Sequence, residues 1–136
     1  VPDLHLGLTG NLPVDWIPDD ELRVTFYTRL ARASDAAAID ALAIEMADRF
    51  GAIPDSAETL LAVARVRASA RAARVARIDA GPGAIALTPL AAGWPARAPD
   101  GWVSKGERWL LKERIDDAGV RLERVEQALE EWREAA

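Results

Sequence analysis

The hydrophobic period of this chain switches from helical to strand-like near residue 75, and that switch limits the folds open to it. Before this point apolar residues recur every three or four positions, as on one face of a helix. After it, residues 75–79 and 84–88 show the short apolar runs of strands, with a glycine-containing hairpin signal at residues 80–83. A further periodic segment closes the chain. The pattern predicts an α+β fold with about four helices and a small antiparallel hairpin or sheet inserted after the third.

The first three helices are marked by residues that satisfy free backbone groups at helix ends. Acidic or hydroxyl side chains, which accept hydrogen bonds from the first N–H groups of a helix, open each segment. They are Asp19 and Asp20, Ser34 and Asp35, and Asp55. Gly51 suits the end of the second helix, since glycine adopts the left-handed conformation there without strain. We expect the third helix to continue to about Arg74.

The C-terminal part predicts a second hairpin and a last helix. Residues 102–103 and 108–111 flank a Ser-Lys-Gly turn. Apolar residues then recur at alternating steps of four and three, which is typical of a helix with one packed seam. They are Leu111, Ile115, Ala118, Leu122, Val125, Leu129 and Trp132. Residues 1–18 are read as an extended leading segment or linker, and residues 19–136 as a single domain. Trp16, Trp94 and Trp102 are expected to cover core edges.

Composition excludes several classes of protein. Half of the 136 residues are hydrophobic, 29% are charged and none is cysteine, which indicates a globular domain without disulfides or thiolate metal sites. The net charge of −5 argues against a general nucleic-acid binder. The chain lacks an initiator Met, a signal peptide and a membrane-spanning apolar run, so we expect a fragment of a longer cytoplasmic protein with no membrane partner.

The sequence offers few parts for chemistry. Gly81 and Gly83 flank a proline and lack the lysine and hydroxyl of a phosphate-binding loop. His5 is the only histidine, so neither a zinc site nor a nucleophilic triad is available. We therefore expect no catalytic residues, no cofactor, no metal and no small-molecule substrate, and interpret the chain as not being an enzyme by itself.

The second helix suggests a surface for protein contact. If Ile39, Leu42, Met46 and Phe50 face the core, a helical wheel places Ala41, Ile44, Glu45 and Asp48 on the outer half. An outward Ile beside two acids is typical of a docking patch for a partner with arginine or lysine. The alternative is that an arginine neutralises Asp48 and that Ile44 packs under another helix.

The third helix carries the opposite charge. Arg67, Arg71 and Arg74 fall in one narrow sector, with Arg65 and Arg77 nearby in the sequence. This stripe would meet phosphates in a nucleic-acid-binding module. Alternatively, the arginines suit the negative end of the helix and pair with acids of the last helix.

Several runs resemble the C-terminal domain of the bacterial transcription-repair coupling factor family. WIPDD at residues 16–20 and RVTFYTRLA at residues 23–31 resemble that domain's opening, with Thr28 where lysine is usual. EMADRFGAIP at residues 45–54 resembles its ELxDRFGxLP signature, and Thr59-Leu60-Leu61 continues the match. The resemblance is specific over residues 12–75.

This resemblance implies a parent protein that is an ATP-dependent DNA translocase, which removes RNA polymerase stalled at DNA damage and recruits the repair protein UvrA. It implies that the present segment is a regulatory domain. Such a domain packs on the UvrB-like module of the same chain, masks UvrA binding and restrains the motor. Glu45 and Asp48 would then pair with arginines of that module, with Ile44 and Ala41 between them, while Arg49 and Phe50 serve the fold. UvrA, RNA polymerase and DNA would be indirect partners through the parent.

Overall fold

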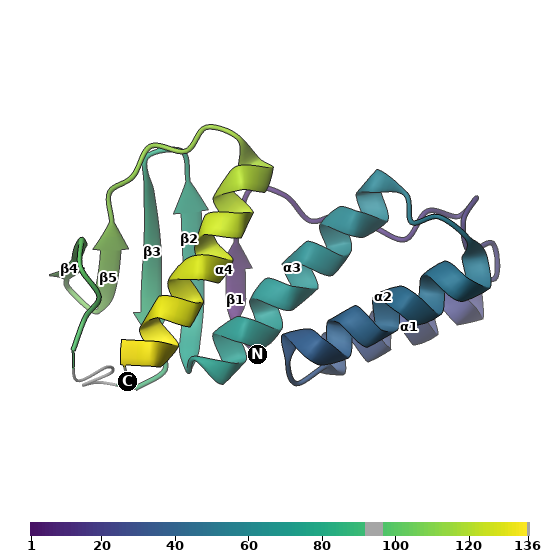
Figure 1. The fold of residues 1–136 in the computed structure, drawn as a ribbon, viewed down its shortest axis with the longest axis horizontal. Helices are drawn as coiled ribbons and strands as arrows, with labels where there is room; N and C mark the ends of the chain where they lie inside the picture. Colours follow the sequence, from purple (N-terminus) through teal and green to yellow (C-terminus); the bar gives the residue numbers. More distant parts are fainter. Residues whose placement is uncertain (92–96, 136) are drawn as a thin grey trace. The chain divides into compact units, whose positions relative to one another are not determined.

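A computed structural model describes residues 1–91 and 97–135, and these residues form four helices and a five-stranded sheet (Figure 1). The α+β class expected from the sequence is confirmed. The chain divides into two compact units: a helical unit, Thr9–Ala68, and a sheet unit, Val1–Leu8 with Ser69–Ala136. The division into a leading segment, residues 1–18, and a regulatory domain, residues 19–136, stays a prediction. Trp94 lies outside the described residues.

The helical unit contains α1 (Asp20–Arg32), α2 (Ala36–Phe50) and most of α3 (Asp55–Ala72). The caps expected from the sequence set two of the starts. The Asp19 carboxylate accepts hydrogen bonds from the backbone N–H groups of Glu21 and Leu22, and the Asp35 carboxylate accepts one from Ala38. Gly51, with φ of 91°, follows the last residue of α2. The predicted helix ends are therefore correct for α1 and α2.

The helical unit has one continuous apolar core. Its buried members come from all three helices and the segment before α1: Leu12, Ile17, Phe26, Leu30, Ile39, Leu42, Met46, Ala57, Leu61 and Ala64. Phe50 meets the rings of Phe26 and Trp16 edge-on, with centroids 5.6 and 5.8 Å away. The Arg49 guanidinium lies over Phe26 and Phe50. The inward face of α2 is thus fixed by this core, which leaves its opposite face free.

The segment before α1 is tied to the other helices by its backbone. Gly10 has φ of 72°, and a Cβ atom there would overlap the backbone of Leu60. The Asn11 N–H donates to the Ser56 carbonyl at 3.0 Å, and the Leu12 N–H donates to the Tyr27 hydroxyl at 2.8 Å. Glycine is required where two backbones approach so closely.

The sheet unit holds five strands in the order β1-β2-β3-β5-β4 (Figure 1). The strands are β1 (Asp3–His5), β2 (Val75–Gly81), β3 (Ala84–Pro89), β4 (Trp102–Lys105) and β5 (Arg108–Leu111). Both hairpins predicted from the sequence are confirmed. The sheet is mixed, however, because β1 pairs in parallel with β2. That pairing extends the small antiparallel sheet that the hairpin signals predicted.

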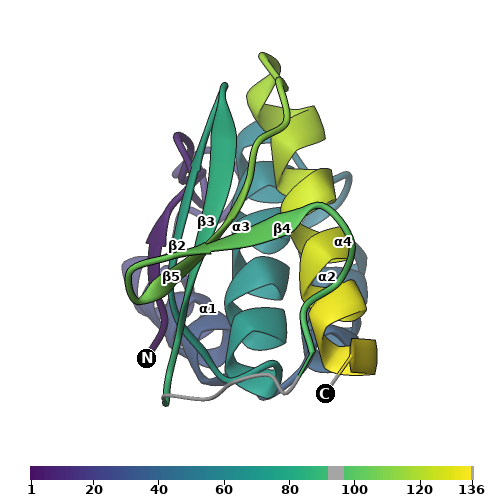
Figure 2. The same ribbon diagram turned by 90° about the vertical axis from the view of Figure 1, so that its left-hand side faces the viewer.

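Helix α4 (Ala118–Ala135) covers one face of the sheet (Figure 2). Trp132 is fully buried, and its ring centroid lies 5.4 Å from those of Trp102 and Trp109. The helix begins later than the apolar seam suggested, since Leu111 lies in β5 and Ile115 precedes the helix. The Asp117 carboxylate caps it by accepting a hydrogen bond from the Val120 N–H at 2.9 Å.

Candidate docking surface on helices α1 and α2

The outward face of α2 presents three of the four residues predicted for docking. Ala41, Ile44 and Asp48 are exposed, and Ile44 keeps 66% of its surface open. The core packing of Leu42, Met46 and Phe50 turns these residues outward, as the helical wheel indicated. Ile44 therefore does not pack under another helix, which was the alternative interpretation of its position.

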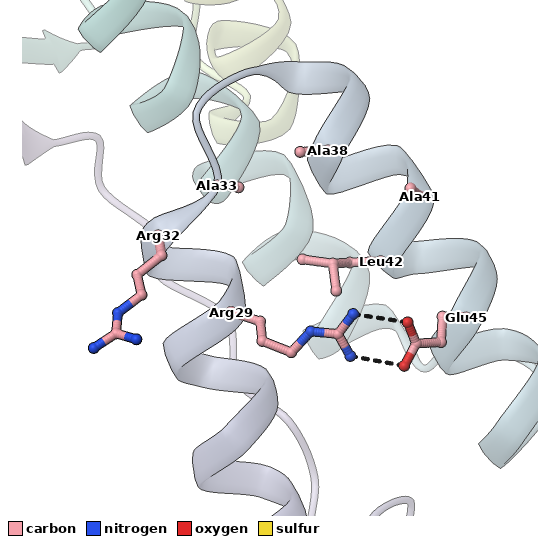
Figure 3. A pocket seen from close by; sticks show the side chains of 7 residues that line it. All are labelled: Arg29, Arg32, Ala33, Ala38, Ala41, Leu42 and Glu45. Carbon is pink, nitrogen blue, oxygen red and sulfur yellow. Dashed lines mark hydrogen bonds and ion pairs between the residues drawn. The ribbon is translucent and has the colours of Figure 1, made fainter.

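Glu45, the fourth predicted residue, is held within the chain (Figure 3). Arg29 on α1 donates from Nη1 to Oε2 at 2.7 Å and from Nη2 to Oε1 at 2.8 Å. Arg49 lies 3.6 Å from the same carboxylate. Hydrogen bonds from Arg29 are the main reason that the pKa of Glu45 lies below its usual value, and they also raise the pKa of Arg29. Glu45 therefore already has an internal partner, and its docking role stays a prediction.

Asp48 differs from Glu45 in this respect. In residues 1–91 and 97–135, no basic side chain lies within ion-pair distance of its carboxylate. Arg49, its neighbour in the sequence, is directed to Glu45 and to the rings of Phe26 and Phe50. Asp48 is thereby left as an exposed acid next to Ile44, one helical turn away.

A pocket of about 400 Å³ lies between the end of α1 and the first turns of α2 (Figure 3). It is lined by Arg29, Arg32, Ala33, Ala38, Ala41, Leu42 and Glu45. Ala41 and Glu45 were predicted on this surface from the sequence, whereas Arg29, Arg32 and the pocket were not. Their position depends on how α1 packs against α2, and the basic residues in the last turn of α1 were the only signal for them.

The arginine stripe is less regular than predicted. Helix α3 ends at Ala72, and Arg74 follows it in the left-handed conformation with φ of 61°, so Arg74 does not share a helix sector with the others. Arg67 belongs to the helical unit, and Arg71 to the sheet unit. The flanking arginines have internal partners: Arg65 pairs with Asp40 at 2.7 Å, and Arg77 with the neighbouring Asp79 at 2.8 Å. The phosphate-binding role of Arg67, Arg71 and Arg74 stays a prediction.

Two features are absent from the described part of the chain. Its histidine and carboxylate side chains form no group of three that would hold a metal ion. None of its helices combines the length and apolar character needed to cross a membrane.

The fold and this surface define a small α+β domain with an exposed apolar and charged face on its helical unit. The chain belongs to the TRCF domain family, whose model matches residues 6–91. The matched range includes all the residues predicted for docking and for phosphate binding.

Relatives agree with this family, and a solved structure shares the fold. The transcription-repair-coupling factor of Haemophilus influenzae is 39% identical over 79 residues, which cover 58% of this chain and 7% of that protein. The Mycobacterium tuberculosis factor is 39% identical over 88 residues, covering 64% and 7%. The chain thus matches about 7% of the length of these relatives. A crystal structure of the C-terminal domain of transcription-repair coupling factor has a TM-score of 0.79 at 19% identity, covering 98% of this chain and 92% of that one.

Proposed function

We propose that this chain is the regulatory C-terminal domain of a transcription-repair coupling factor. In this role it docks on the UvrB-like module of the same parent, masks the surface that binds UvrA and restrains the ATP-dependent DNA translocase. RNA polymerase and DNA are then partners of the parent rather than of this domain. A factor that works on transcribed bacterial DNA acts in the cytoplasm. The domain itself supplies no catalysis; the motor belongs to the rest of the parent.

The observation that carries the proposal is the exposed pair of Ile44 and Asp48 on α2. An open aliphatic side chain next to an acid without an internal partner supports contact with a surface that offers an apolar residue and a cation. A regulatory clamp must also open. A small polar contact of this kind releases more readily than a large apolar interface.

Asp48→Arg is a clearer test than Glu45→Arg. The second change would place a new arginine next to Arg29 and Arg49 and could disturb the fold. We expect Asp48→Arg to lose most of the affinity of this domain for a separately expressed UvrB-like module of the cognate coupling factor. Asp15→Arg is the matched control, since Asp15 is exposed and lies outside α2. In the intact factor, Asp48→Arg should raise UvrA binding and basal ATPase activity. Wild-type values of module affinity, UvrA binding and ATPase activity for Asp48→Arg would refute the proposed docking role.

A further inference from the structure

The β4–β5 hairpin carries two like charges directly opposite each other. Lys105 and Arg108 are register partners on either side of its turn, and both are exposed. Like charges at facing positions of paired strands destabilise the pair. Within residues 1–91 and 97–135, neither cation lies within ion-pair distance of a carboxylate, and Asp79 on β2 is bonded instead to Arg77 at 2.8 Å. The hairpin therefore holds a repulsion that no ion pair of the described chain offsets.

Both cations lie on the sheet face opposite α4. The ring of Trp109 lies 5.4 Å from that of Trp132 on α4. Because successive side chains of a strand alternate between faces, Arg108 and Leu110 point the other way. The register places Val103 opposite Leu110 on this same face, where Val103 keeps 52% of its surface open. The face thus presents an open aliphatic side chain beside two cations.

Strand β4 is the last strand of the sheet on this side (Figure 1). Among the residues that the structure describes, none forms a strand against its outer edge, so the edge can accept a further strand through main-chain hydrogen bonds. A short edge strand that carries lysine discourages pairing with neutral or basic strands. β4 has four residues and ends at Lys105. An acidic strand is the kind that this charge attracts.

The exposed side chains favour a polypeptide over a nucleic acid. A surface for single-stranded nucleic acid combines cations with aromatic rings on which the bases stack. The two aromatic residues of the hairpin, Trp102 and Trp109, contact Trp132 on the α4 face and are not available for stacking on the opposite one. The basic face offers the aliphatic Val103 instead. A segment with carboxylate and aliphatic side chains matches it better.

We infer that the β4–β5 hairpin is a docking surface for an extended acidic segment of a partner protein. The segment pairs with the free edge of β4, its carboxylates face Lys105 and Arg108, and an aliphatic side chain covers Val103. The hairpin belongs to the sheet unit, whereas the docking residues on α2 belong to the helical unit. The inference is therefore independent of the proposed function and gives the domain a second contact surface.

The probe is a synthetic peptide of alternating Glu and Val, which is acidic and favours an extended conformation. NMR titration of the 136-residue chain measures its affinity, and hydrogen exchange reports whether the β4 amides become protected. An alternating Gln and Val peptide is the neutral control, and a 12-nucleotide single-stranded DNA tests the alternative ligand. Lys105→Glu and Arg108→Glu each reverse one cation of the hairpin, and Arg32→Glu is the control at an exposed arginine of α1.

We expect the Glu-Val peptide to bind and to protect the β4 amides. Lys105→Glu and Arg108→Glu should each weaken its binding by about fivefold or more, while Arg32→Glu stays within about twofold of wild type. Lys105→Glu should also unfold at a higher temperature than wild type, because it turns a repulsive facing pair into an attractive one. A loss of affinity in this variant then cannot come from a loss of fold.

Three results would overturn the inference. The first is equal binding of the Gln-Val peptide, or affinity for the Glu-Val peptide that neither hairpin reversal changes. The second is binding of the DNA through Lys105 and Arg108 without binding of the peptide, which would make the face a nucleic-acid site. The third is no binding of any probe, which would mean that the cations serve only to keep the edge of β4 unpaired.

Discussion

Arg29 and Glu45 form a bidentate ion pair between α1 and α2, in which Nη1 donates to Oε2 at 2.7 Å and Nη2 donates to Oε1 at 2.8 Å. The pair lines the pocket, links the last turn of α1 to the middle of α2, and gives Glu45 an internal partner. Its presence makes the stability of the helical unit depend on pH.

Arg29→Met should lower the unfolding temperature at neutral pH, with a difference from wild type that disappears in acid. The pKa of Glu45 is lower in the folded chain than its usual value of 4.5. The pair therefore stabilises the fold above that value and ceases to do so as the pH falls through the lower, folded pKa. Thermal unfolding of both proteins across this range measures the effect. Glu45→Gln should show the same loss at neutral pH, whereas a constant difference at all pH values would contradict the assignment to this pair.

Gly10→Ala should destabilise the chain by more than about 1 kcal/mol, because the new methyl group meets the backbone of Leu60 and the residue has positive φ. Gly83→Ala is the control, since nothing lies within 4 Å of a Cβ atom there. Urea unfolding gives both free energies. Equal stability of the two variants would show that Gly10 tolerates a side chain and that the close approach to α3 is absent in solution.

Trp132→Ala should cost about 3–5 kcal/mol of unfolding free energy, the usual range for deleting a large aromatic from a core. Trp132 is fully buried and contacts both Trp102 and Trp109. The measurement is urea unfolding followed by circular dichroism. Trp132→Phe, which keeps an aromatic ring, should lose less. A cost below about 1 kcal/mol for the alanine variant would mean that α4 is not held on the sheet by this cluster.

Arg74→Gly should be more stable than Arg74→Ala by about 1 kcal/mol, because glycine alone adopts the left-handed conformation without a Cβ penalty. Arg74 has φ of 61° immediately after α3. Both variants remove the same charge, so the comparison isolates the backbone. Thermal unfolding provides the measurement, and the reverse order would place Arg74 in an ordinary helical conformation.

Binding to duplex DNA separates the docking role from the nucleic-acid-binding alternative. With a net charge of −5 the chain should show no measurable affinity at about 0.15 M salt. The experiment is fluorescence anisotropy at several salt concentrations. An affinity that falls steeply with salt, and that Arg67→Ala or Arg71→Ala reduces, would favour the alternative instead.

Local signals in the sequence were sufficient for most of the fold. Asp19 and Asp35 predicted helix starts correctly because a cap acts within three residues of itself. The hairpins were equally local. The parallel pairing of β1 with β2 could not be predicted from local signals, because its partners, such as Asp3 and Arg77, lie far apart in the sequence. Parallel strands are not joined by a tight turn, so no turn residue in the sequence indicates this pairing.

The candidate site also has one part that could be predicted from the sequence and one part that could not. The exposure of Ile44 and Asp48 follows from the period of α2, which the sequence displays. The capture of Glu45 by Arg29 and the pocket beside Arg32 depend on how two helices approach each other. Helix packing leaves no short motif in the sequence, so these features required the structure.

The position of β1 also bears on how the chain folds as it is synthesised. β1 and β2 are neighbours in the sheet, and the helical unit is inserted between them in the sequence. The pairing of β1 with β2 therefore joins residues that are far apart in the sequence, which raises the contact order of the sheet. During synthesis, β1 can pair only after the inserted helical unit and β2 have left the ribosome. The helical unit, whose helices follow one another directly in the chain, has no such delay. We therefore expect the helical unit to fold first and the sheet to form afterwards.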